Sequence, residues 1–280
     1  MTRKVKLTKI ENVGPNQRVT VRLALGVTYN KIVFFFEGNI DASLVSNIVM
    51  NINGSERQRW KTRAHLQARN SYNNGASSLT ALELDFIEKD AKDEAAMTIG
   101  AIAATREAGV QDLVIEFDLG NYVNSAASKV RGVAEVDVPS KNSLIVRNRA
   151  LQRVPAGAAE EQITLPFGRN GELVKRLYIF GDLAKIDSVR VRREGADEFE
   201  EITQDQNEFF QQTYGKVPQA GLFVVDFTEH DLMGQMLNTS SIIGPDGKPQ
   251  LIENLDVRLN VNAAGTFDIY TESITNNDRP

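Results

Sequence analysis

Four side chains that could bind a metal ion lie close together near residue 230. His230 is flanked by Glu229 and Asp231, and Asp226 precedes them by a few positions. Imidazole and carboxylate groups are common ligands of divalent ions. However, no His-x-x-x-His, Cys-x-x-Cys or EF-hand spacing accompanies them, and such residues are also typical of a solvated loop after a strand. The sequence therefore favours a loop over a metal site.

Three further acidic residues, Asp90, Asp93 and Glu94, could hold a calcium ion weakly between subunits. They lack the spacing of a calcium-binding loop, so a structural calcium ion stays unassigned. The other histidine, His65, lies among arginines in a polar stretch. A surface or stacking role fits this setting better than catalysis.

The sequence contains no recognisable constellation for enzyme catalysis. It has no cysteine, which excludes a thiol nucleophile, a disulfide scaffold and a cysteine metal site. No Gly-x-Ser-x-Gly motif occurs, and neither histidine lies in a triad context. Residues 244–248 end in a Gly-Lys pair, but no strand and loop lead into a helix there, so they do not form a phosphate-binding loop. We predict a protein that is not an enzyme and needs no cofactor.

Four basic residues, Arg3, Lys4, Lys6 and Lys9, precede the first acidic residue, Glu11. One interpretation is a solvated terminal arm. The other is a contact with an anionic surface such as lipid headgroups, where each cation adds about 1 kcal/mol.

The overall composition bounds the partners and the location. The net charge of −5 argues against nucleic-acid binding as the main task, because such domains usually carry a basic face. No run of about 18 apolar residues exists, so we expect no membrane-spanning helix. The first six residues lack the apolar core of a signal peptide. We therefore expect synthesis in a cytoplasm and no direct contact with nucleic acid.

The elements that would position these residues repeat along the chain. Each copy is predicted to run strand, strand, strand, polar helix and strand, and then to close on one further strand. In the first copy these elements are residues 17–23, 28–36, 47–53, 55–70, 79–86 and 110–118. In the second copy they are residues 161–165, 173–180, 187–192, 200–212, 222–227 and 252–260. A repeat this long predicts a duplicated domain, because the units of a solenoid are shorter.

Alternating apolar and polar residues mark strands with one buried face. In residues 19–25 the odd positions are expected to face a core, while Thr20 and Arg22 face solvent. Strands of this kind belong to antiparallel sheets. Residues 32–36 are apolar on both sides, so either both faces are covered or one face meets another domain or subunit.

Two polar helices are predicted at matching places in the two copies. In residues 55–70, Trp60, Ala64 and Ala68 recur every four positions, which predicts a surface helix with a narrow buried stripe. In the second copy a helix is predicted over residues 203–212, with Phe209 and Phe210 as its buried anchors. Gly215 would lie near its C-terminal end. The Ala-rich residues 95–106 fit either a short helix or a loop.

A strand over residues 129–138 and a turn cluster over residues 139–143 place the domain boundary near Pro139. The predicted domains are residues 1–138 and 139–280, rigidly packed because no flexible linker separates them. Many short antiparallel strands with turn signals between them predict an all-β fold with a few short surface helices. Two similar copies give two tandem eight-stranded jelly-roll β-sandwiches, a double jelly roll.

The order of these features resembles the double jelly-roll major capsid proteins. The likeness is greatest to those of small tailless bacterial viruses with an internal membrane, the corticovirus kind and their marine relatives. It rests on the strand pair 26–36, the segment 60–62, the helix end 207–216, and the strands 222–227 and 254–259. It covers about residues 5–275.

The resemblance implies a structural subunit without enzymatic activity, with two jelly rolls roughly normal to a capsid surface. Three subunits would form a pseudo-hexagonal trimer that tiles an icosahedral shell over an internal membrane. The implied partners are neighbouring capsomers, a penton protein, and minor membrane-associated virion proteins or the inner lipid membrane. Arg3, Lys4, Lys6 and Lys9 are the candidate membrane-facing or inner-shell contact. The implied location is the virion capsid, after synthesis in the host bacterial cytoplasm.

Two other functions compete with the capsid role. A carbohydrate-binding tandem β-sandwich, either a lectin or a spike, needs exposed aromatic or acidic sugar contacts. A jelly-roll glycosidase or lyase needs two carboxylates that face each other across a concave sheet. The sequence has one Trp, and its Phe residues mostly occupy core-facing positions in the predicted strands. The sequence therefore favours the capsid subunit.

Overall fold

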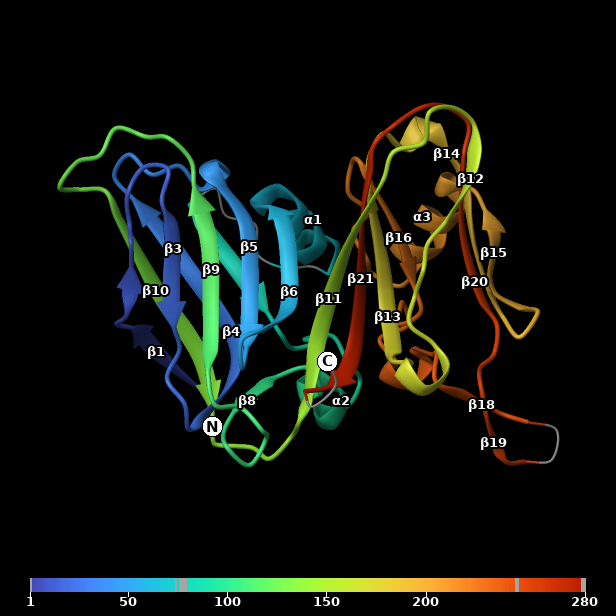
Figure 1. Ribbon diagram of the computed structural model, residues 1–280, viewed down its shortest axis with the longest axis horizontal. Coiled ribbons are helices and arrows are strands. Elements are labelled where there is room, and N and C mark those ends of the chain that lie inside the picture. The colour runs from blue at the N-terminus through green and yellow to red at the C-terminus, as the bar shows by residue number, and fades with distance from the viewer. Residues whose placement is uncertain (1, 74, 76–79, 245–246, 278–280) are drawn as a thin grey trace. The chain divides into compact units, whose positions relative to one another are not determined.

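The chain divides into two compact units (Figure 1). A computed structural model describes residues 2–73, 75, 80–244 and 247–277. The first unit comprises Met1–Arg149 and Thr275–Pro280, and the second comprises Ala150–Ile274. The first unit therefore includes the last few residues of the chain. The domain boundary predicted near Pro139 stays a prediction.

The first unit is a sandwich of two antiparallel sheets. One sheet has the order β1-β10-β4-β7, with β8 also paired to β4; the other has the order β2-β3-β9-β5-β6. The strands of the first sheet are β1 (Arg3–Leu7), β10 (Lys129–Asp137), β4 (Val27–Glu37), β7 (Ala81–Asp85) and β8 (Ile102–Ala104). The strands of the second sheet are β2 (Ile10–Glu11), β3 (Arg18–Arg22), β9 (Leu113–Leu119), β5 (Val45–Ile52) and β6 (Ser55–Thr62). The sheets meet where Phe34 of β4 lies 5.3 Å from Phe117 of β9, measured between ring centroids.

The second unit is built in the same way. Its sheets have the orders β11-β21-β13-β16, with β17 paired to β13, and β12-β20-β14-β15. The first of these contains β11 (Leu144–Arg153), β21 (Phe267–Asn276), β13 (Leu173–Phe180), β16 (Leu222–Asp226) and β17 (Leu237–Asn238). The other contains β12 (Ala159–Gln162), β20 (Leu255–Val261), β14 (Ile186–Arg193) and β15 (Ala196–Ile202). A separate hairpin pairs β18 (Ser241–Ile243) with β19 (Pro249–Leu251). Side chains from both sheets, among them Leu177, Val189 and Leu259, form one buried core.

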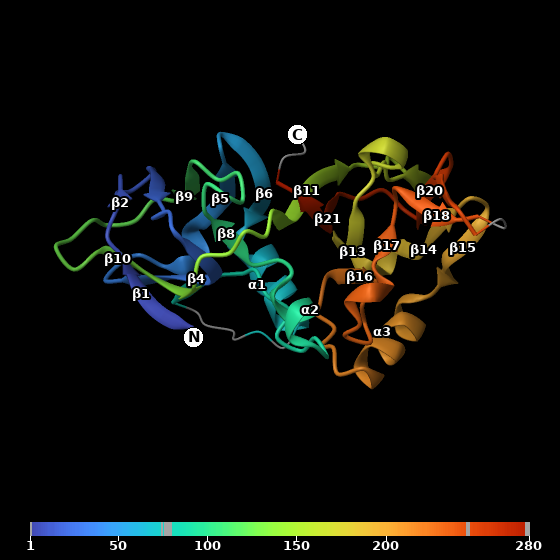
Figure 2. The same cartoon turned by 90° about the horizontal axis from the view of Figure 1, so that it is seen from below.

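Helices are short and few among the described residues. They are α1 (Arg63–Tyr72), α2 (Glu94–Thr98) and α3 (Gln204–Thr213), and Figure 2 shows them from below. Four single-turn 3₁₀ helices join the strands: η1 (Ala42–Leu44), η2 (Gly168–Asn170), η3 (Leu183–Lys185) and η4 (Met233–Gln235). None of the helices in the described ranges is long and apolar enough to cross a membrane.

The predicted duplication is confirmed, because eight strands of one unit have counterparts in the other, in the same chain order and the same sheet positions. The pairs are β1/β11, β3/β12, β4/β13, β5/β14, β6/β15, β7/β16, β9/β20 and β10/β21. The local devices repeat as well. Thr62 caps α1 and Thr203 caps α3. Asn70 of α1 donates to the Glu83 carbonyl, and Gln211 of α3 donates to the Val224 carbonyl, at equivalent strand positions.

The predicted alternation holds within β3 and fails after it at Leu25, which is 42% exposed although the odd positions were expected to face the core. Val19 and Val21 are fully buried, while Arg22 is exposed, as the alternation required. The apolar stretch 32–36 also alternates: Ile32 and Phe34 are fully buried, whereas Phe35 is 41% exposed. The helix-or-loop segment 95–106 contains most of α2 and the short strand β8.

The single helix predicted over residues 55–70 is wrong in its first half. Residues 55–62 form the strand β6, and the buried Trp60 lies on it. The cause is a tight hairpin: Asn53 and Gly54 both adopt positive φ, which joins β5 to β6 in the turn that the Asn-Gly pair favours. Thr62 then accepts a hydrogen bond from the His65 amide and begins the helix.

The predicted anchors of α3 are also wrong. Phe209 is 67% exposed and Phe210 is 51% exposed. The buried face of the helix is polar instead: the side chains of Asn207 and Gln211 both donate to the Val224 carbonyl at 2.7 Å. Hydrogen bonds rather than apolar contacts therefore hold α3 to its sheet. Residues 245 and 246, within the segment 244–248 that was excluded as a phosphate-binding loop, lie outside the described residues.

Candidate functional site

The four basic residues near the N-terminus belong to an ordered edge of the first unit. Arg3, Lys4 and Lys6 lie on β1, which pairs antiparallel with β10, and Lys9 follows the strand. In a strand successive side chains point to opposite faces of the sheet. Arg3 therefore shares the core-facing side with Val5 and Leu7, while Lys4 and Lys6 lie on the outer side. Of the predicted solvated arm, the free arm is wrong, because β1 is a paired strand, whereas all four basic residues are exposed to solvent.

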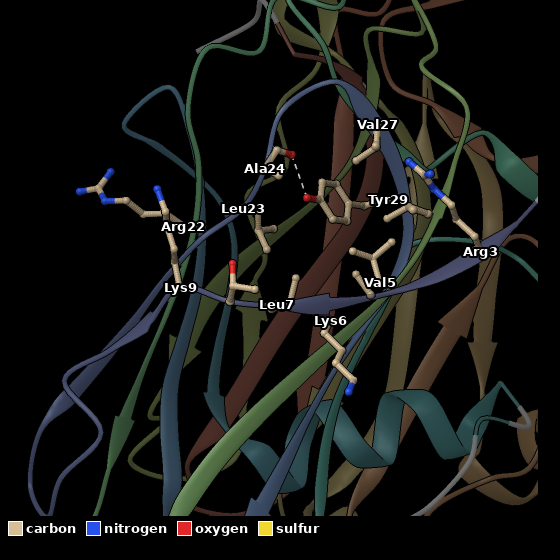
Figure 3. A pocket seen from close by; sticks show the side chains of 13 residues that line it. Arg3, Val5, Lys6, Leu7, Lys9, Arg22, Leu23, Ala24, Val27 and Tyr29 are labelled. Atoms are coloured by element: carbon tan, nitrogen blue, oxygen red, sulfur yellow. Dashed lines mark hydrogen bonds between the residues drawn. The ribbon is translucent and has the colours of Figure 1, made fainter.

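The inner side of β1 forms one wall of a pocket of about 330 Å³ (Figure 3). Apolar side chains from β1, from β10 and from the start of β4 line its interior. They are Val5, Leu7, Val27, Tyr29, Ala134 and Val136. Basic residues stand at the edges: Arg3 at one end, and Lys9 with Arg22 at the other (Figure 3). The pocket is therefore apolar within and positively charged at its rim.

Tyr29 shapes the wall of this pocket without offering it a reactive group. Its hydroxyl donates to the Ala24 carbonyl at 2.8 Å, and the ring is 2% exposed. Burial raises the pKa of the Tyr29 hydroxyl to about 12, so the group stays neutral at physiological pH. Gly132 lets β1 lie close against β10, because a Cβ there would meet the Leu7 side chain at 2.7 Å. The pocket is thus suited to receiving an apolar group, not to chemistry.

The side chains near His230 are engaged with one another and with cations. Asp226 pairs with Arg176 at 2.8 Å, and both side chains are fully buried. Asp231 pairs with Lys216 at 2.5 Å. His230 lies 3.5 Å from Glu229 and stacks on Tyr214, with ring centroids 3.9 Å apart.

Electrostatics around Glu229 follow from this arrangement. Burial raises the pKa of the Glu229 carboxyl above its usual range, and the negative charge of Asp226 adds to the shift.

Within the described part of the chain, no group of three His, Asp or Glu side chains is placed to hold a metal ion. Asp93, in the acidic segment of the first unit, caps α2 by accepting from the Ala96 amide at 2.7 Å. His65 lies half-buried on α1.

The face of α3 that sequence reasoning placed in the core is the second notable surface. Phe209 and Phe210 contact each other edge to face, with centroids 5.9 Å apart, and remain largely exposed. Tyr214 is 38% exposed beside them. The only signal in the sequence against core anchors was the pair of amide residues, Asn207 and Gln211, on either side of the two aromatics. By contrast, Trp60 is 2% exposed and is not available for stacking on a sugar.

Comparisons with known proteins give the context for these surfaces. A family model described as the viral coat protein P2 N-terminal domain matches residues 4–137, and the corresponding C-terminal domain model matches residues 146–277. Among curated proteins no sequence matches the chain.

Solved structures share the fold at low sequence identity. The major capsid protein P2 of bacteriophage PM2 superposes with a TM-score of 0.83 at 17% identity, over 100% of both chains. The major capsid protein of Sulfolobus turreted icosahedral virus gives 0.65 at 10% identity, over 97% of this chain and 96% of that one. The PBCV-1 virus capsid protein gives 0.61 at 11% identity, over 98% and 93%. The predicted double jelly-roll fold is thereby confirmed.

Both domains of one coat protein match in order and together span nearly the whole chain, so the chain belongs to the viral coat protein P2 family and is a viral major capsid protein.

Proposed function

We propose that three copies of this major capsid protein form a pseudo-hexagonal capsomer, and that such capsomers tile an icosahedral shell over an internal membrane. The observation that carries the proposal is the duplication. Eight strands of one unit recur in the other with the same order and sheet positions. Three chains therefore supply six similar units, which is the number a hexagonal outline requires.

The proposal assigns the partners and the place of the protein. The partners are two further copies in the capsomer, neighbouring capsomers, a penton protein and membrane-associated virion proteins. The protein acts in the virion capsid after synthesis in the host bacterial cytoplasm, without catalytic turnover and without direct contact to nucleic acid. The net charge of −5 supports the last point, because it repels a polyanion.

Light scattering on a sizing column, with negative-stain images of the peak, tests the capsomer. The expected mass is that of three chains of 31.0 kDa each, with hexagonal outlines in the images. A stable monomer at every salt and calcium concentration would overturn the proposal. The same column run in calcium and in a chelator tests whether calcium between subunits contributes. If it does, the trimer dissociates in the chelator.

We also propose that Arg3, Lys4, Lys6 and Lys9 make the contact with the inner membrane or an inner-shell protein. Lys4 and Lys6 lie on the outer side of β1, and Lys4 has only a long 3.8 Å pairing with Glu135. Cosedimentation with vesicles that contain phosphatidylserine tests this contact. Replacing all four residues with Gln should abolish binding, whereas the same replacement at the exposed Lys92, Lys129, Arg131 and Lys141 should not. Equal loss in both variants would contradict a specific contact.

A further inference from the structure

We infer that the pocket beneath β1 receives the β15–α3 edge of a second copy of this chain, so that the capsomer closes head to tail. The inference rests on the trimer proposed above and names the surfaces that join it. Of the four basic residues proposed above for the membrane contact, it places Arg3 and Lys9 at the boundary between two copies and leaves the outward Lys4 and Lys6 to face the membrane.

The chain itself contains a template for this contact. β11 is the counterpart of β1, and β6 is the counterpart of β15. The first half of β11 belongs to the first unit, where it lies against β6. Gln58 of β6 donates to the Val146 carbonyl at 3.1 Å, and Asn148 of β11 donates to the Arg59 carbonyl at 2.9 Å. Within one chain, the counterpart of β1 (β11) thus already lies beside the counterpart of β15 (β6).

The remaining counterparts, β1 and β15, are each the last strand of their sheet. An open edge strand is a template for unwanted pairing unless another element covers it. If the contact between neighbouring copies repeats the template, β15 of one copy lies beside β1 of the next. When one surface of a subunit binds a different surface of the next, the subunits form a closed ring if the rotation that relates them returns to the first subunit.

The exposed aromatics of α3 supply the apolar side of the contact. Phe209 and Phe210 are 67% and 51% exposed and contact each other, and Tyr214, four residues after Phe210, is 38% exposed. Contiguous exposed apolar groups mark interaction sites in soluble proteins. The position on α1 that corresponds to Phe210 is Arg69, which is buried and donates to the Asp85 carbonyl. The equivalent helix position is therefore buried in the first unit, at Arg69, and exposed in the second, at Phe210.

Charge complements shape at the two surfaces. The rim of the pocket carries Arg3, Lys9 and Arg22, and Arg22 is 57% exposed beside Asp112. The opposite edge carries exposed carboxylates on β15 and at the start of α3, among them Glu200 and Asp205. An apolar pocket with a basic rim fits an aromatic edge with an acidic border. Opposite charges also favour this pairing over self-association of either surface.

Cross-linking tests the pairing directly, because the chain has no cysteine of its own. The double variant Val5→Cys with Phe210→Cys is treated with a short bismaleimide at low protein concentration. We expect covalent products of two and three chains, and none above three, because the ring closes. Each single-cysteine variant should give no covalent product.

The outcomes separate this inference from the capsomer proposal. If light scattering shows trimers but the double variant does not cross-link, the inference fails and the trimer stands. If Phe210→Cys alone cross-links, α3 pairs with itself and the inference also fails. If no trimer forms with the natural chain, the capsomer proposal itself is wrong.

A mixing experiment checks the head-to-tail sense with variants that block one surface each. Val5→Glu blocks the pocket and Phe210→Glu blocks the aromatic edge, so each alone should be a folded monomer by circular dichroism and light scattering. Equimolar mixing should give dimers, since one chain keeps its α3 and the other its pocket. Val123→Glu, at a side chain that is 78% exposed, should remain trimeric. A Val5→Glu protein that stays trimeric but no longer binds vesicles would assign the pocket to lipid and overturn the inference.

Discussion

At the scale of single residues, the groups best suited to chemistry are used for structure. Asp226 lies on β16 and neutralises the buried Arg176, while its second oxygen accepts from the Thr228 amide and hydroxyl. Lys175 and Glu272 form a second buried pair at 2.8 Å next to it. Buried charges persist only when they are paired and hydrogen-bonded. The carboxylates near His230 are therefore part of the packing of the second unit.

Replacing Asp226 with Asn should destabilise the protein by about 3 kcal/mol, because Arg176 would keep its charge in a buried site without its nearest partner. The amide retains the shape and one acceptor oxygen, so the change removes the charge and one of the two hydrogen-bond acceptors. Urea unfolding of the variant measures the loss. The matched control is Asp112→Asn, at an ion pair whose side chains are 57% and 50% exposed. It should cost less than about 1 kcal/mol, and equal losses would contradict the argument.

Glu229 should make the protein less stable as the pH rises. Its folded-state pKa is raised above the ordinary value of 4.5, so the folded protein holds this proton more tightly than the unfolded chain does. The stability that this proton contributes is complete below pH 4.5 and is lost as the pH rises through the folded pKa. Glu229→Gln removes this dependence. The urea midpoint of the variant, relative to that of the natural protein, should therefore be higher at pH 7 than at pH 4. The same difference at both pH values would contradict this.

At the scale of elements, most strands could be predicted because alternation reports burial directly. Val19 and Val21 face the core, as their spacing required. Two elements failed for separate reasons. β6 is a polar strand at a sheet edge, and the spacing of Trp60, Ala64 and Ala68 resembled one face of a helix although Trp60 lies on β6. Phe209 and Phe210 are apolar like core residues but lie exposed, and the local sequence pattern does not distinguish these two environments.

The hairpin turns that carry the edge strands β6 and β15 should depend on glycine at equivalent positions. Gly54 has φ of +75° and Gly195 has φ of +80°, and a Cβ at either would meet open space. Alanine at each position should therefore cost only the backbone strain, about 1 to 2 kcal/mol. Thermal or urea unfolding measures the cost. Gly157→Ala is the control: its Cβ would also meet nothing, but its φ is not positive, so it should be neutral or slightly stabilising.

At the scale of the whole molecule, duplication explains how one chain can supply two kinds of edge. The first unit includes residues 144–149 of β11, a strand whose other residues belong to the second unit. The contact between β6 and β11 is therefore formed within the chain, during folding. The corresponding edges β1 and β15 stay open in a single chain, and the proposed ring uses them. Under that proposal, the duplicated fold forms one of the two matching contacts within the chain and the other between subunits.

Residues 275–277 should stabilise the first unit. Asn277 belongs to the first unit and is 3% exposed. Arg57 donates to its carbonyl at 2.7 Å, and its own amide donates to the Ser143 carbonyl at 2.7 Å. A chain that stops after Ile274 loses both hydrogen bonds, each worth about 1 kcal/mol. Hydrogen exchange should then quicken in β6 and around residue 143, while β13 and β16 keep their protection. A chain that stops after Asn277 should exchange like the natural protein. Faster exchange throughout the second unit would instead show that residues 275–277 support that unit.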